Sequence, residues 1–103
     1  MTTDMNGVAE FQRAAEAKLE QVLAARGVAH TPFHTGGGSP PVRYTTLTHE
    51  GREYTVVISD NITMTHGDQL FECYLHSEFA DDQKLIDSFA ARLDRFLAGQ
   101  PWN

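Results

Sequence analysis

The sequence predicts an α+β fold: a two-layer sandwich in the order α-β-β-β-β-α, with a four-stranded antiparallel meander sheet and both helices on one face. Apolar residues recur at helical spacing in one segment near each end of the chain. Between these segments, Thr- and Val-rich sequence is divided by three turn signals into short stretches typical of strands. Since 103 residues suffice for one hydrophobic core, we expect a single domain over 1–103.

The first helix is predicted over residues 7–26. Its apolar stripe recurs every three or four residues, and charged side chains fill the opposite face. Gly27 follows at the position where glycine commonly ends a helix. The stripe consists of Val8, Phe11, Ala15, Leu19, Val22 and Leu23.

Residues 27–42 are predicted to be a Gly/Pro-rich loop, which includes the stretch HTPFHTGGGSPPV at 30–42. The imidazoles of His30 and His34 are potential metal ligands, and consecutive glycine amides can bind an anion. Pro32 and the glycines disfavour the helix that would bring the histidines to one face, and spacing indicates no third ligand. We therefore expect no metal site and a mobile flap. The candidate binding residues of this loop are His30, His34, Gly36, Gly37 and Gly38.

The sheet is predicted over 43–77, with turns at Glu50-Gly51, at Ser59-Asp60-Asn61 and at Gly67-Asp68. We expect Asn61 to adopt a positive φ and Gly67 to open a type II′ turn. These turns define the register, because a slip of one residue would invert every side chain. The expected pairs are Leu47 with Tyr54, Thr45 with Val56, Ile58 with Ile62, Val56 with Met64, Tyr54 with His66, Met64 with Phe71 and Ile62 with Cys73.

This register predicts one apolar face for the helices to cover and one mixed face that stays open. The covered face would carry Leu47, Tyr54, Val56, Ile58, Ile62, Met64, Phe71, Cys73 and Leu75. The open face combines threonines with aromatic and aliphatic side chains, as a protein contact surface does, although a solvated sheet face explains the same pattern. The candidate binding residues on it are Tyr44, Val57, Leu70, Glu72, Tyr74 and His76.

The second helix is predicted over residues 80–98. Asp81 and Asp82 lie at its positive end and Arg92 and Arg95 near its negative end, as the helix dipole favours. Its apolar stripe consists of Leu85, Ile86, Phe89, Leu93, Phe96 and Leu97.

Composition restricts the class of partner. The net charge is −6 and the eight Lys and Arg residues are scattered, which disfavours nucleic acid and anionic membranes. No apolar run approaches the roughly 20 residues that span a bilayer. Cys73 is the single cysteine, so no intramolecular disulfide can form, and we expect a cytoplasmic protein.

The function expected from these features is that of a small acidic protein-binding or inhibitory module. It would act through the open sheet face or an edge strand, and it would form a homodimer. The alternative is a small-molecule or metal-dependent enzyme that uses His34, Glu72, Tyr74 and His76 near the 30–42 loop. The sequence contains no Ser/His/Asp arrangement, Walker loop, GxSxG or HExxH motif, so we assign no catalytic residue and no cofactor, and favour the binding module.

Overall fold

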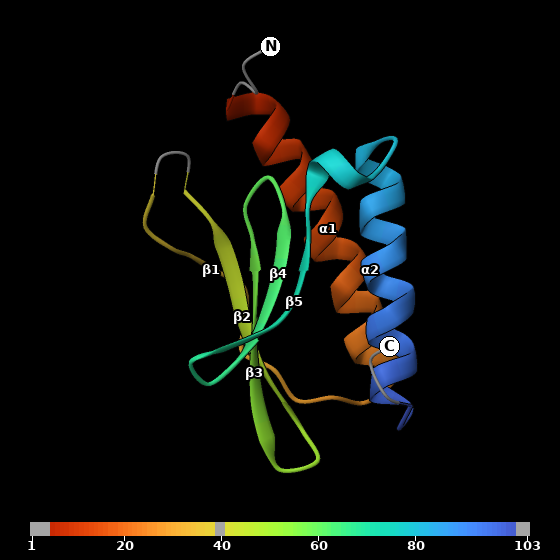
Figure 1. Ribbon diagram of the computed structural model, residues 1–103. Coiled ribbons are helices and arrows are strands. Elements are labelled where there is room, and N and C mark those ends of the chain that lie inside the picture. Colours follow the sequence, from red (N-terminus) through yellow and green to blue (C-terminus); the bar gives the residue numbers. More distant parts are fainter. Residues whose placement is uncertain (1–4, 39–40, 101–103) are drawn as a thin grey trace.

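The structure is a computed structural model that describes residues 5–38 and 41–100, with the backbone alone at residues 5, 6, 71 and 76. The described part contains helices at both ends and an antiparallel sheet in meander order β1-β2-β3-β4-β5 (Figure 1). The elements are α1 (Met5–Ala25), β1 (His34–Thr35), β2 (Arg43–His49), β3 (Arg52–Ile58), β4 (Ile62–His66), β5 (Gln69–Tyr74), the 3₁₀ turn η1 (His76–Glu78) and α2 (Asp82–Leu97). The predicted fold class is confirmed.

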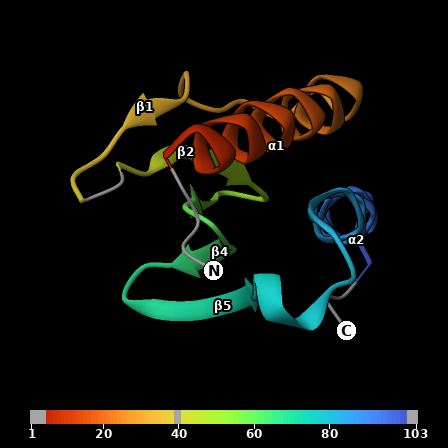
Figure 2. The ribbon, with the colours of Figure 1, turned by 90° about the horizontal axis from the view of Figure 1, so that it is seen from above.

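Both helices lie on the same side of the curved sheet, where they pack against each other (Figure 2). The predicted apolar stripes of the two helices meet the inward side chains of the three central strands in one core. Burying these side chains provides most of the driving force for folding, at about 25 cal/mol per Å² of apolar surface. The largest fully buried apolar side chains are Leu19, Leu23, Leu47, Val56, Ile58, Ile62, Met64, Leu85, Ile86, Phe89 and Leu93.

The segment expected to be a loop contains a short edge strand. His34 and Thr35 of β1 pair with Tyr44 and Arg43 of β2. The Gly36 amide donates to the Val42 carbonyl at 2.7 Å, which continues this pairing. A Cβ on Gly36 would lie 2.8 Å from a methyl carbon of Val42, so only glycine fits this approach. The predicted loop over 27–42 is therefore corrected: its described part is held against the edge of β2.

The registers of β2 with β3 and of β3 with β4 are as predicted, including Leu47 opposite Tyr54 and Val56 opposite Met64. The first of these hairpins turns at Glu50 and Gly51, whose φ angles of 52° and 77° are those of a type I′ turn. The expectation of a positive φ at Asn61 is wrong, because Glu50 is the one non-glycine residue with that conformation among those described.

The predicted register of β5 fails beyond a β-bulge. His66 and Thr65 pair with Gln69 and Leu70 as the turn requires, but Met64 then pairs with Glu72 and not with Phe71. Ile62 likewise pairs with Tyr74 and not with Cys73. One extra residue of β5 is inserted between these pairs, and it shifts every later side chain to the other face.

The bulge corrects the predicted faces of Glu72, Cys73 and Tyr74, and Leu75, which was expected on the covered face, is 42% exposed. Glu72 and Tyr74 lie opposite buried residues of β4, so they belong to the helix-covered face and not to the open one. Cys73 lies opposite Thr63 on the open face, although it was expected in the core. Tyr74 packs edge-on against the fully buried ring of Phe89, with the ring centroids 5.3 Å apart. A tyrosine buries far more apolar surface there than a cysteine would, which explains the preference for this register.

Candidate protein-binding surface

The open side of the sheet forms a continuous surface, because both helices pack on the opposite side (Figure 2). We call it the outer sheet face and define it as Tyr44, Thr46, Thr48, Glu53, Thr55, Val57, Thr63, Thr65, Leu70 and Cys73. Two rows of paired residues cross it, one through Tyr44, Val57, Thr63 and Cys73 and the other through Thr46, Thr55, Thr65 and Leu70.

The outer sheet face is almost uncharged. Glu53 is the one Asp, Glu, Lys or Arg residue among the ten that define it, and it lies beside the β2–β3 turn. Leu70 has 64% of its surface exposed, and Val57 is half-buried between Tyr44 and Thr63. An apolar centre surrounded by hydroxyl groups is typical of surfaces that contact other proteins.

Of the residues predicted on this surface, Tyr44, Val57 and Leu70 are present, whereas Glu72 and Tyr74 are not. The side chain of His76 lies outside the described part, and its backbone belongs to η1. The surface also includes Cys73, whose thiol sulfur lies 3.6 Å from the Thr63 hydroxyl oxygen. Alternation in the sequence alone could not reveal Cys73, because the bulge reverses its face.

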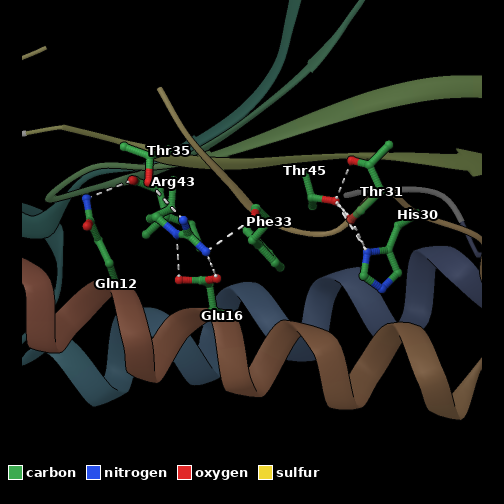
Figure 3. Close-up of polar contacts among 9 residues, drawn as sticks. Gln12, Glu16, His30, Thr31, Phe33, Thr35, Arg43 and Thr45 are labelled. Atoms are coloured by element: carbon green, nitrogen blue, oxygen red, sulfur yellow. Dashed lines mark hydrogen bonds and ion pairs between the residues drawn. The ribbon is translucent and has the colours of Figure 1, made fainter. Parts of the chain in front are cut away.

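The histidines of the 30–42 loop lie at the β2 edge of the sheet. His30 Nδ1 lies 2.7 Å from the Thr31 carbonyl oxygen and 3.3 Å from the hydroxyl oxygen of the buried Thr45 (Figure 3). The His34 ring packs beside Tyr44, with the ring centroids 5.5 Å apart. Gly37 and Gly38 are exposed.

His34 is not brought near Glu72, the carboxylate that the enzyme hypothesis requires. His34 lies on β1 and Glu72 on β5, at opposite edges of the sheet. Four strand spacings, about 19 Å measured along the sheet, separate their strands. Within the described part of the chain, no three His, Cys, Asp or Glu side chains are arranged to hold a metal ion.

Two polar side chains of α1, which the sequence pattern did not indicate as site residues, hold the β2 edge (Figure 3). Glu16 accepts two hydrogen bonds from Arg43, at 3.0 and 2.9 Å, and these bonds raise the pKa of that guanidinium. Gln12, which is 8% exposed, donates to the carbonyls of Pro41 and Ile58. Arg43 could have indicated this contact, since the register places its charged side chain on the face that the helices cover, where it requires an acidic partner.

No helix described in the structure is long and apolar enough to cross a membrane. Comparisons of the chain with protein-family models, with curated proteins and with solved structures found no match.

Proposed function

We propose that this protein is a small acidic protein-binding module whose contact surface is the outer sheet face, and that a second copy of the chain is one partner. The observation that carries this proposal is an open, nearly uncharged face on a chain with a net charge of −6. Buried like charges would oppose association, so an interface between two acidic copies requires a surface with few carboxylates.

The size of the face supports a weak, reversible dimer. Four strands at about 4.8 Å spacing and five residues at about 3.3 Å rise give a footprint of roughly 300 Å². Stable interfaces bury about 800 Å² on each partner. We therefore expect a concentration-dependent homodimer that dissociates readily, so that the outer sheet face of the monomer is available to other proteins.

Two further features support this class of function. The scattered Lys and Arg residues provide no concentrated basic surface for nucleic acid. The single thiol, at Cys73, leaves the chain without an intramolecular disulfide, as is common for proteins of the reducing cytoplasm. We therefore propose a cytoplasmic protein that acts on other proteins.

Sedimentation velocity over a wide protein concentration range tests the self-association. Val57→Asp places a carboxylate at the centre of the face, and we expect it to keep the protein monomeric at concentrations where the wild type dimerises. Ala17→Asp adds the same charge at an exposed position of α1 and should leave dimerisation unchanged. A wild type that stays monomeric at millimolar concentration, or a Val57→Asp variant that dimerises equally well, contradicts self-association through this face.

A further inference from the structure

The free edge of β5 has an unusual arrangement of backbone donors. No described strand lies beyond β5 in the sheet. The Cys73 amide donates to the Glu72 carboxylate at 3.1 Å, and the amide of Leu75, the residue directly after β5, donates to the Glu78 carboxylate at 3.3 Å. Amides two residues apart on an extended chain point to the same side. Two donors that an additional strand would use are therefore occupied by acidic side chains.

A hollow of about 310 Å³ lies beside this edge. The rings of Tyr74 and Phe79, stacked with their centroids 5.6 Å apart, provide an apolar wall, and Glu72 and Glu78 also line it. Such a combination suits Lys or Arg, whose apolar stem packs along rings while the charged head reaches a carboxylate. The remaining lining residues are Cys73 and Ser88.

We propose that the edge of β5 binds an extended, basic segment of a partner protein as an added strand. The proposal rests on the proposed function only in that the protein acts by binding other proteins. Carbonyl oxygens of the added strand take the places of the Glu72 and Glu78 carboxylates at the two amides. The released carboxylates then pair with the basic side chains of that strand, so the acidic edge selects a positively charged partner.

The geometry of the edge also defines the side-chain pattern of the partner. Side chains of the added strand that point to the helix side lie next to Tyr74, where the hollow favours Lys or Arg. The intervening side chains point to the outer sheet face, beside the exposed Leu70. The segment that fits therefore alternates basic with apolar or β-branched residues.

A second copy of this chain does not fit the same edge. Pairing β5 with β5 would bring two sets of Glu72 and Glu78 carboxylates together, and like charges facing each other across strands are destabilising. None of the described strands alternates basic with apolar residues. The occupant of this edge is therefore different from the second copy proposed for the outer sheet face.

The test uses a ten-residue peptide in which Lys and Val alternate, titrated into ¹⁵N-labelled protein at low ionic strength and followed by NMR. We expect the largest shift changes at the amides of Cys73 and Leu75. The double variant Glu72→Gln/Glu78→Gln should bind about tenfold more weakly, because two exposed charge pairs are lost. The matched double variant Glu10→Gln/Glu20→Gln removes the same charge from exposed positions of α1 and should bind as the wild type does.

Three results would overturn the inference. The first is equal binding of a peptide that alternates Lys with Gly, since that chain has the charge but little tendency to form a strand. The second is that the α1 double variant weakens peptide binding as much as the Glu72→Gln/Glu78→Gln variant does. The third is that the chemical shifts of the Cys73 and Leu75 amides do not change at millimolar peptide. The Val57→Asp monomer should still bind the peptide. A wild-type protein that dimerises but does not bind the peptide therefore refutes this inference alone. A wild-type protein that binds the peptide but stays monomeric refutes only self-association.

Discussion

Arg43 and Glu16 form a two-pronged ion pair that joins β2 to α1, with its two hydrogen bonds at 3.0 and 2.9 Å. The same guanidinium donates to the Thr35 hydroxyl at 2.9 Å and to the Phe33 carbonyl at 3.3 Å. Glu16 has only 15% of its side chain exposed and Arg43 has 31%. A single charged group thus holds the helix, the neighbouring strand and the short edge strand β1 together.

We expect Glu16→Ala to lower the free energy of unfolding by about 1 to 3 kcal/mol, because it leaves a partly buried guanidinium without its carboxylate. Urea unfolding measures this loss. Hydrogen exchange at the Gly36 amide, which is bonded to Val42, should also become faster as β1 loosens. Glu10→Ala removes an exposed carboxylate from the same helix and serves as the control. Equal effects of the two substitutions would show that the ion pair does not hold this edge.

The position of Cys73 on the outer sheet face can be checked by its reactivity. We expect a small thiol reagent to modify the native protein within about tenfold of the rate in urea, because the thiol lies on a face that neither helix covers. In the comparison protein Cys73→Ser/Met64→Cys, the thiol replaces a fully buried side chain and should be strongly protected. Strong protection of Cys73 itself would contradict the bulge.

The β2–β3 turn contains a strained residue. Glu50 adopts a φ of 52°, which asparagine tolerates better than glutamate does. We expect Glu50→Asn to stabilise the protein by about 0.5 to 1 kcal/mol, seen as a higher urea midpoint. Asp68→Asn makes the same charge change in a neighbouring turn, at a residue without a positive φ, and should have a smaller effect. A Glu50→Asn variant no more stable than the wild type would contradict this account of the turn.

The Arg26–Asp94 pair between the C-terminal ends of the helices predicts a dependence on pH. The hydrogen bond from Arg26, and then its charge, lower the pKa of the Asp94 carboxyl in the folded state. A carboxyl whose pKa falls on folding contributes stability above its unfolded pKa, and this contribution is lost as the pH falls through the folded value.

We therefore expect Asp94→Asn to be less stable than the wild type near pH 7, by an amount that shrinks toward zero as the pH falls below the ordinary pKa of an Asp carboxyl. Both side chains are exposed, so the difference will be small, and urea midpoints measured across this range will detect it. Asp87→Asn on the same helix is the control. A stability difference that stays constant with pH would rule out this contribution.

Local sequence determined most of the fold because the relevant signals act over short distances. Apolar residues at helical spacing produced both stripes that now line the core, and Gly27 follows the end of α1. The turns at Glu50-Gly51 and at 59–61 are short, so they leave one register for the pairs they join. The position of Tyr44, Val57 and the threonines of β2 to β4 on the open face followed from the same alternation.

Tertiary structure decided β5 and β1, where local signals conflict or are absent. In β5, apolar residues occupy both alternating sets, Leu70 and Tyr74 in one and Phe71 and Cys73 in the other, so alternation could not select a face. The register that places Tyr74 against Phe89 of α2 prevails, because that contact buries more apolar surface. β1 depends on Arg43, which donates to Thr35 and is held by Glu16, 27 residues away in the chain, so only the folded arrangement brings these residues together.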